Sequence, residues 1–401
     1  MTGPLSSAPF RWLLAARTTA IVGNAVAPIA LAFAVLDLTG SAADLGLVVA
    51  ARSVANVAML LFGGVIADRL PRGAVLVGSS LAAAATQGTI AALVLTGTAG
   101  VPVLVALSIA NGAVAAVSLP AAAALVPDTV PAALLRPANA LLRLGLNAGG
   151  IVGASVGAVV IAATGPGWGL VIDACAFAVA AVLFSRLRLP APADAAPGGD
   201  GASVWGDLRE GWREFASRRW VWIVVLQFTV LNAAFVGATT VLGPVVADET
   251  FGRGGWGIVV AAQTAGLALG AVIALRWRPR RALGIGVAAM ASAALPAAAL
   301  GLAPTLPVLI VAFALGGLAI ELFAIAWDQS LQAHIPRAAL SRVYSYDMVG
   351  SFVAVPVGEV VVGPLAEAGG ATPVLLGCAA IIVVATVAAS CSRSIWRIRA
   401  P

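Results

Sequence analysis

Five charged residues stand inside long apolar stretches of this chain, and their side chains are the best placed to do chemistry. They are Arg52, Arg143, Asp173, Glu321 and Glu359, with Asp328 and Asp347 nearer the ends of such stretches. A charge is costly in an apolar medium, so it usually faces a protein interior or water. Burial also favours the protonated form of a carboxylate, which lets it exchange protons near neutral pH. We therefore expect Glu321, Glu359 and Asp173 to bind protons, and Arg52 and Arg143 to form ion pairs.

Twelve apolar stretches must position these charges. The chain has 401 residues, of which 61% are hydrophobic and 10% charged, whereas a soluble domain carries about 25% charged residues. Each stretch approaches the ~20 apolar residues that a membrane-spanning helix needs, and none alternates like a barrel strand. The predicted spans are residues 11–36, 43–67, 74–97, 102–126, 137–163, 167–187, 220–246, 255–275, 282–302, 306–330, 343–366 and 371–391. The sequence therefore predicts an all-α membrane protein with twelve transmembrane helices.

Two short sequence segments that recur along the chain indicate an internal duplication. Residues 65–74 return as 272–282 with one insertion, and residues 132–136 return as 338–342. The offsets agree, at 272 − 65 = 207 and 338 − 132 = 206. We predict a six-helix bundle over 1–187, a connector over 188–219 and a second six-helix bundle over 220–401. Such duplicated bundles are typical of transporters that rock about a site near the bilayer midplane.

The distribution of charge predicts the orientation of the chain. All 23 basic residues are Arg, and nearly all the loop Arg residues fall on the side of the N-terminus. The opposite connections carry acidic residues, with Arg253 their only basic one. Basic loops stay in the cytoplasm, so both termini are expected there, in a multi-pass protein of the plasma membrane. Arg residues scattered over many loops do not suggest nucleic-acid binding.

The composition excludes several kinds of site. His334 is the only histidine, and Cys175, Cys378 and Cys391 lack paired spacing, so neither a metal site nor a disulfide frame is expected. We also find no nucleophile–base set and no phosphate-binding loop, so we expect no enzyme and no cofactor. In the connector, Trp205, Leu208, Trp212 and Phe215 recur at helical spacing. They predict an amphipathic helix on the inner surface, which serves either as a tether or as a regulatory element.

The segment from Gly64 to Arg72 resembles the inner-loop signature of the major facilitator superfamily. It has a Gly, then an Asp after a small residue, then two Arg residues: Gly64, Asp68, Arg69 and Arg72. The resemblance implies the facilitator fold, with two pseudo-symmetric six-helix bundles. It also implies an inner gate, in which Asp68 caps a helix N-terminus near Arg342 and Arg69 or Arg72 pairs with Asp128.

The fifth predicted span carries Gly149, Gly153 and Gly157 on one helical face, which suits close helix packing. This span resembles the Gly-rich helix of facilitator antiporters, although Ala154 replaces the usual Pro. Tight packing alone explains the pattern equally well. Phrases at 172–174, 207–212 and 341–347 resemble the branch of enterobactin-type and macrolide-type exporters.

In the facilitator arrangement the spans holding Arg52 and Glu359 face each other. Arg52 lies nine residues from the outer end of its span and Glu359 seven from the end of its own, so their depths differ by about 3 Å. An ion pair between the bundles is therefore plausible, either as part of transport or as a permanent structural contact.

The function expected from these features is proton-coupled export of a hydrophobic or amphipathic small molecule, such as a drug, natural product or siderophore. A largely apolar cavity with few acids suits lipophilic compounds. The alternatives are a proton-coupled importer or facilitator of a small metabolite, and a non-transporting sensor of the same fold. The expected partners are the substrate, protons and the bilayer, with the chain acting as a monomer.

Cysteine labelling tests the predicted topology. Cysteine at Gly100 or in place of Glu367 should react with an impermeant reagent added outside intact cells, and cysteine at Ala195 should react only after permeabilisation. The reason is the concentration of Arg in the inner connections. External labelling at Ala195 would overturn the predicted orientation.

Neutralising Asp68 tests the inner gate. Asp68→Asn should remove an anion–dipole contact of about 0.3–2 kcal/mol, and shift the conformational equilibrium toward the inward-open state by roughly twofold to thirtyfold. Transport should slow while binding from the cytoplasmic side is kept. Leu275, the equivalent position in the second bundle, provides the control. Normal transport by Asp68→Asn contradicts the gate, and lost membrane abundance indicates a folding role instead.

Overall fold

The computed structural model describes residues 3–69, 72–187, 212–277 and 279–399, and within them the chain is helical, without a β-strand. Twelve helical segments of this described part are long and apolar enough to cross a membrane. Helix rather than strand follows from the composition, because only a helix or a closed barrel satisfies backbone polar groups in lipid.

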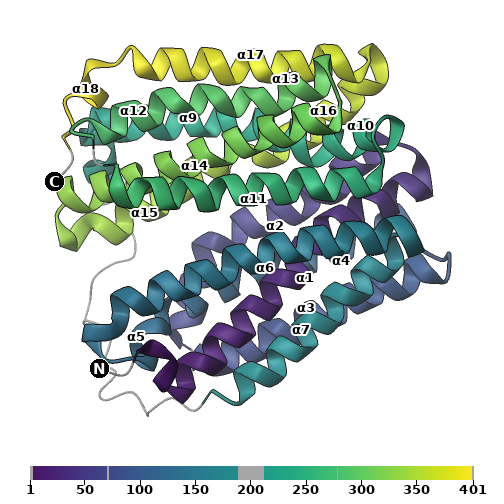
Figure 1. Cartoon of the computed structure of the whole chain (residues 1–401), viewed down its shortest axis with the longest axis horizontal. Helices are drawn as coiled ribbons and strands as arrows, with labels where there is room; N and C mark the ends of the chain where they lie inside the picture. The colour runs from purple at the N-terminus through teal and green to yellow at the C-terminus, as the bar shows by residue number, and fades with distance from the viewer. Residues whose placement is uncertain (1–2, 70–71, 188–211, 278, 400–401) are drawn as a thin grey trace.

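Helices of the first half form one bundle, which Figure 1 shows in purple to teal. Its long members are α1 (Ala8–Thr39), α2 (Ala42–Arg69), α3 (Arg72–Leu95), α4 (Val101–Ala124), α6 (Leu135–Thr164) and α7 (Pro166–Ser185). Three short pieces accompany them: η1 (Pro4–Ser6), α5 (Val126–Thr129) and η2 (Ala132–Leu134).

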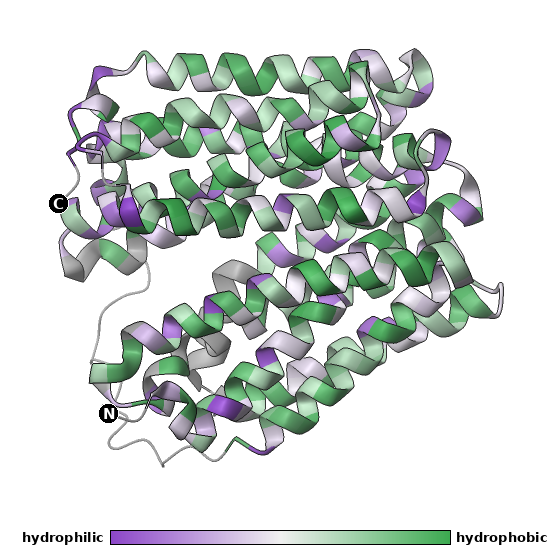
Figure 2. Ribbon diagram, viewed as in Figure 1, coloured by the Kyte–Doolittle hydropathy of each residue, from purple (hydrophilic) through white to green (hydrophobic). Residues whose placement is uncertain are grey.

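The second half forms the other bundle, drawn in green to yellow. It comprises α9 (Arg219–Val236), η3 (Gly237–Leu242), α10 (Gly243–Glu249), α11 (Arg253–Arg276), α12 (Ala282–Ala289), η4 (Met290–Ala293), α13 (Ala294–Leu302), α14 (Leu306–His334), α15 (Arg337–Phe352), α16 (Val355–Gly369), α17 (Ala371–Ser390) and α18 (Arg393–Trp396). Figure 2 shows mostly apolar ribbon along both bundles, with hydrophilic residues gathered toward their ends, as a bilayer requires.

The two bundles meet at one end and diverge toward the end that holds both chain termini (Figure 1). We name these the closed end and the open end. At the closed end α2 packs on α16 and α6 packs on α11. A Cβ built on Gly363 would lie 2.5 Å from the Ala42 carbonyl oxygen, and one on Gly257 would lie 1.9 Å from the Ala158 Cβ. Glycine is therefore required where the bundles touch, because any side chain would push them apart.

Two of the spans in the second bundle are interrupted near their middle. The seventh span passes through η3, a π-helical turn, between α9 and α10. The eleventh breaks between α15 and α16, at residues 353–354, just before Pro356. Proline has no N–H to donate to the carbonyl four residues earlier, so it disrupts a continuous helix. The predicted span over 343–366 is present as the candidate span Val343–Gly369, with this break inside it.

Part of the predicted amphipathic connector helix, including Trp205 and Leu208, lies outside the described residues. The helical residues 212–217 follow, and there Trp212 and Phe215 pack with their ring centroids 5.6 Å and 5.9 Å from Tyr346 of α15. Glu214 accepts a hydrogen bond from Arg218, which holds the pKa of the Glu214 carboxyl below its usual value. The aromatic face of this connector segment therefore covers the second bundle.

Candidate functional site

A cavity of about 630 Å³ lies between the two bundles and is lined by both of them. We call it the central cavity. Its polar lining residues are Arg52, Ser53, Asn56, Thr239, Thr240, Gln263, Thr264 and Glu359. Its larger apolar ones are Trp256, Phe313, Met348 and Phe352. The volume falls in the ~300–1,000 Å³ range of small-molecule sites, and a mostly apolar wall with a few polar groups is typical of them.

The interrupted helices both contribute to this cavity. The π-helical turn η3 presents Thr239 and Thr240, and the break in the eleventh span lies between the lining residues Phe352 and Val355. Helix irregularities of this kind often occur at functional sites, and discontinuous helices surround the substrate sites of many transporters. The two helix irregularities and the central cavity therefore lie in the same region of the structure.

Glu359, one turn into α16, is the only acidic residue among the described residues that line the central cavity. It is 1% exposed. Its Oε1 accepts a hydrogen bond of 3.0 Å from the Ser53 hydroxyl of the opposite bundle, while Oε2 has no hydrogen-bond partner within the described part. A buried carboxylate with one free oxygen and a neutral donor is well suited to exist in both protonation states.

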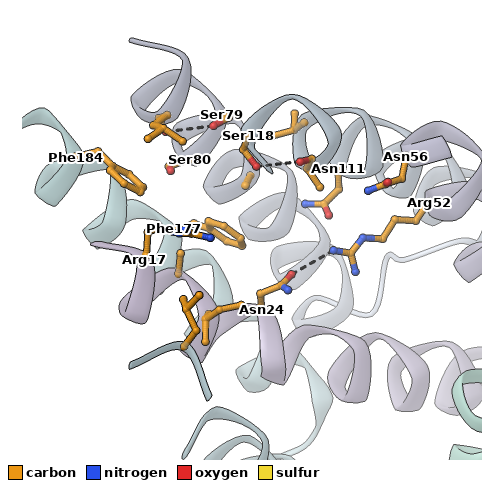
Figure 3. Close-up of a pocket in the computed structure, with 17 residues that line it drawn as sticks. Arg17, Asn24, Arg52, Asn56, Ser79, Ser80, Asn111, Ser118, Phe177 and Phe184 are labelled. Carbon is orange, nitrogen blue, oxygen red and sulfur yellow. Dashed lines mark hydrogen bonds between the residues drawn. The ribbon is translucent and has the colours of Figure 1, made fainter. Parts of the chain in front are cut away.

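Arg52 of α2 lies between carboxylates of both bundles. It donates a hydrogen bond of 3.2 Å to Asn24 Oδ1, drawn as a dashed line in Figure 3. Asp173 of its own bundle and Glu359 of the other one both act on its charge electrostatically. The predicted partners Arg52 and Glu359 both line the central cavity, but among the described residues no ion pair joins them, and it is Ser53, the neighbour of Arg52, that donates to the carboxylate.

Asp173 of α7 is completely buried, at 0% exposure. A Cβ built on Gly23 of α1 would come 2.7 Å from its Oδ1 atom, so the absence of a side chain there makes room for the carboxylate. The charge of Arg52 acts on it electrostatically, and neither oxygen has a partner at hydrogen-bond geometry among the described residues. Asp173 therefore points into its bundle beside Arg52, and it is not among the described residues lining the central cavity.

Arg143 and Glu321, which were predicted separately as an ion-pair candidate and a proton site, contact each other in the structure. Arg143 of α6 donates to Glu321 of α14 across 3.2 Å, so this ion pair joins the two bundles. The Arg143 side chain is 65% exposed and that of Glu321 17%. Glu321 is not among the described residues that line the central cavity. The contact lies toward the open side and is exposed, so it is a weak cross-link that can break as the bundles move.

A second set of charges holds the closed end together, and we call it the latch. Arg253 of α11 donates two hydrogen bonds to Asp37 of α1, of 2.9 and 2.5 Å, and two to Asp248, of 2.7 and 3.2 Å. Its guanidinium also lies 4.9 Å from the centroid of the Phe33 ring. Glu367 of α16 accepts bonds from Ser41 and from the Ala43 backbone N–H, at the N-terminus of α2. An anion is favourable at that position.

The predicted inner-gate residues cannot be placed as a contact set. The described part does not include the side chains of Asp68, Arg69, Arg72 and Arg342 or the surroundings of Gly64, so the contacts of the inner gate remain a prediction. Asp128 stands in the short helix α5 at the open end.

The glycine face of α6 lies against α1. Cβ atoms built on Gly149, Gly153 and Gly157 would come within 2.2–2.9 Å of Ile21, Val22 and Val26. The structure thus supplies a packing role for these glycines, while the antiporter role stays a prediction.

Arg17 was missed in the sequence, although it lies inside the first predicted span. It lines a second cavity of about 300 Å³ within the first bundle, together with Arg52 and Asn56 (Figure 3). It lies ten residues into α1 and was not among the charged residues considered. Counting helix turns from the inner end would have identified it.

Comparison with known proteins agrees with this architecture. The sequence model of the Major Facilitator Superfamily matches residues 13–274, and the chain belongs to that family. It is 25% identical over 375 residues to the multidrug efflux pump Tap of Mycolicibacterium fortuitum, which covers 90% of each chain. The protein is therefore a multi-pass membrane transporter and not an enzyme, as predicted.

Solved structures share the fold. A mutant of the nucleoside transporter NupG superposes with a TM-score of 0.78 at 15% identity, covering 95% of this chain and 98% of that one. A bacterial homologue of the human lysosomal transporter Spinster, in an inward-facing and unoccupied conformation, gives 0.70 at 16% identity, with 98% of both chains covered. The predicted fold class is thus confirmed.

Removing the Arg253 contacts of the latch should favour the conformation in which the closed end is open. Arg253→Gln deletes the contacts to Asp37 and Asp248, and partly exposed pairs of this kind contribute about 1 kcal/mol or less, which corresponds to at most about fivefold in population. A cysteine at Thr240, in the central cavity, should then react faster with an impermeant reagent added on the side opposite the termini. Glu249→Gln, an exposed neighbour outside the latch, should leave the rate unchanged. Equal rates in Arg253→Gln and wild type would contradict the latch.

Proposed function

We propose that this transporter is a proton-coupled exporter of hydrophobic or amphipathic small molecules, in the plasma membrane with both termini in the cytoplasm. The observation that carries the proposal is Glu359, a buried carboxylate with a free oxygen, set in the wall of a mostly apolar cavity between the bundles. The similarity to a protein named as a multidrug efflux pump supports export.

Protonation of Glu359 would change the balance of charge around Arg52. With Glu359 ionised, the guanidinium lies between two negative groups from different bundles. With Glu359 protonated, Asp173 remains as the ionised partner inside the first bundle. The attraction that draws α16 toward α2 would then weaken, because Coulomb energy between charges is large where water is excluded. Proton binding at Glu359 would therefore favour separation of the bundles on the α2–α16 side.

This change couples protons to alternating access. In the proposed orientation the closed end faces outward, so the structure corresponds to an inward-open state. Glu359 would release its proton toward the cytoplasm here, which restores its attraction to Arg52 and leaves the cavity free for substrate. Substrate binding in place of the proton would have to drive reopening at the outer side, and Glu359 would take up a proton from outside once that side is open. Competition between substrate and proton at Glu359 would lead to the exchange of substrate for protons across the membrane.

The wall of the central cavity indicates the substrate class. Trp256, Phe313, Phe352 and Met348 offer polarizable surface without fixed hydrogen-bond geometry, and Met adapts readily to different shapes. Thr239, Thr240, Thr264 and Gln263 of the wall supply a few neutral polar contacts. A site of this kind favours lipophilic molecules and tolerates variety among them. A sugar would need many fixed hydrogen bonds, which this wall does not offer.

Transport assays with matched carboxylate variants test the coupling. In everted vesicles, Glu359→Gln should abolish substrate-dependent proton movement while keeping gradient-free exchange of substrate. The neutral amide retains the size and the Ser53 contact but cannot cycle its proton. Asp173→Asn and Glu321→Gln test the other predicted sites in the same way, and Glu249→Gln is the exposed control. Full proton-driven transport by Glu359→Gln would show that this assignment is wrong.

The same preparations decide between the functional classes. Accumulation of substrate inside everted vesicles on acidification of the lumen supports export, and movement in the reverse direction supports an importer. Absence of flux from proteoliposomes that still bind substrate would favour a sensor. A panel of lipophilic and hydrophilic compounds separates the substrate classes.

A further inference from the structure

A second cavity, of about 300 Å³, lies wholly within the first bundle, and we call it the N-bundle cavity. It is lined from α1, α2, α3, α4, α6 and α7 and shares only Arg52 and Asn56 with the central cavity. Figure 3 shows Arg17 and Arg52 reaching into it from two sides, with Asn24 between them. It is therefore a separate compartment that touches the proposed transport site at Arg52.

The charged residues described in the wall of this cavity are all basic. Arg17 and Arg52 line it, and no acidic residue does so among the described lining residues. Arg52 is balanced by Asp173 and Glu359, which both act on it electrostatically. Arg17 makes neither an ion pair nor a hydrogen bond with any residue of the described part, although it is partly buried and lies ten residues into the 32-residue helix α1. A guanidinium in that position is costly unless an anion or water accompanies it.

The remaining polar groups are hydrogen-bond donors well suited to an anion. They are the amides of Asn24, Asn56 and Asn111 and the hydroxyl of Ser80. Asn111 donates one of its two N–H groups to Thr86, while the Ser79 and Ser118 hydroxyls donate to the Leu76 and Ala115 carbonyls. Asn24 uses its oxygen to accept from Arg52, which leaves its amide N–H groups free to donate. Two guanidinium groups and neutral donors repel a hydrated proton, so a proton pathway is disfavoured here. They attract carboxylate or phosphate, which guanidinium groups bind in a fork geometry.

The cavity also provides an apolar surface and a route to it from the bilayer. Phe177, Phe184 and Leu76 form part of its wall. Ser79 and Val114 are shared with a third, open groove of about 430 Å³ between α2, α3 and α4, whose other lining residues are Met59, Gly78 and small aliphatic side chains. A ligand entering through this groove would present an alkyl chain to it and an anionic group to Arg17.

We propose that the N-bundle cavity binds an amphiphilic anion, a carboxylate or phosphate monoester with a short alkyl chain, through Arg17. The ligand enters from the bilayer through the groove between α2, α3 and α4. The anionic group pairs with Arg17 and accepts hydrogen bonds from Ser80 and the asparagine amides, and the chain packs on the aromatic wall. This site is distinct from the proposed export cavity and does not depend on the direction or coupling of transport.

Calorimetric titration of the purified full chain tests the site with four probes: octanoate, octyl phosphate, octanol and inorganic phosphate. Octanoate or octyl phosphate should bind with a stoichiometry near one, and octanol at least about tenfold more weakly, because a charge-assisted contact is worth a factor of about ten or more. Arg17→Gln should lower the affinity for the anionic amphiphile by about the same factor. Arg17→Lys, which keeps the charge, should recover part of it.

Arg11→Gln is the matched control, because Arg11 lies on the same helix, bonds to the Leu5 carbonyl and lines neither cavity. It should bind like wild type. Ser118→Leu fills the cavity without changing its charge and should also prevent binding, which keeps the test valid if Arg17→Gln does not fold.

Equal binding of octanol and octanoate, or unchanged affinity in both Arg17→Gln and Ser118→Leu, overturns the proposal. Binding of inorganic phosphate as tight as that of octyl phosphate overturns its amphiphilic part and assigns the site to a water-soluble anion from the cytoplasm. None of these outcomes requires transport, so failure of the export proposal leaves this test unaffected.

Discussion

The charge of Arg52 is the constraint on which the site depends. A guanidinium that cannot lose its proton stands inside the membrane region, and negative groups from both bundles act on it. Asn24 satisfies one of its donors, and Gly112 of α4 lets its backbone come close, since a Cβ there would lie 2.2 Å from the Arg52 carbonyl oxygen. One fixed cation thus links the interior of the first bundle to a carboxylate of the second. Changes in protonation on either side alter the attraction between the bundles.

Small residues make this arrangement possible, because the same helices must both touch and move. A Cβ on Gly46 of α2 would lie 2.2 Å from the Glu359 carbonyl oxygen, so α16 can approach only a glycine there. Helix association in lipid relies on such close contact, since lipid gives no hydrophobic driving force between helices. The ion pairs at the latch and between Arg143 and Glu321 add weak, exposed contacts. Their low strength permits the closed end to open.

The fold was largely predictable from the sequence, and the site only in part. Span number, helix type and duplication follow from hydropathy and from the repeated phrases, because a bilayer leaves few alternatives. Counting residues from the outer ends of the two spans predicted that Arg52 and Glu359 lie at similar depths in the membrane. In the structure both residues line the central cavity. Depth alone does not give the direction in which a residue points around its helix. The sequence therefore did not reveal that Arg143 would meet Glu321, or that Arg17 would face a cavity.

Helix breaks were the other feature that the sequence did not show clearly. Pro356 was visible in the sequence, but many membrane helices tolerate a proline with only a kink, as α1 does at Pro28. Whether a proline interrupts a span depends on the neighbours that satisfy the freed backbone groups, which is a property of the packed bundle. The π-helical turn at Gly237 has no sequence signature of its own. Both irregularities lie in the wall of the central cavity, where a regular helix would have presented different side chains.

The exclusive use of arginine for basic residues has an electrical consequence. An arginine stays positive at every physiological pH, so Arg52 contributes a constant charge, and the net charge of the group Arg52, Asp173 and Glu359 is set by the two acids alone. Each proton that reaches Glu359 from one side of the membrane and leaves on the other crosses the transmembrane field. That passage is worth about 2.3 kcal/mol per charge at 100 mV. The membrane voltage, and not only the difference in acidity, would therefore act directly on this carboxylate.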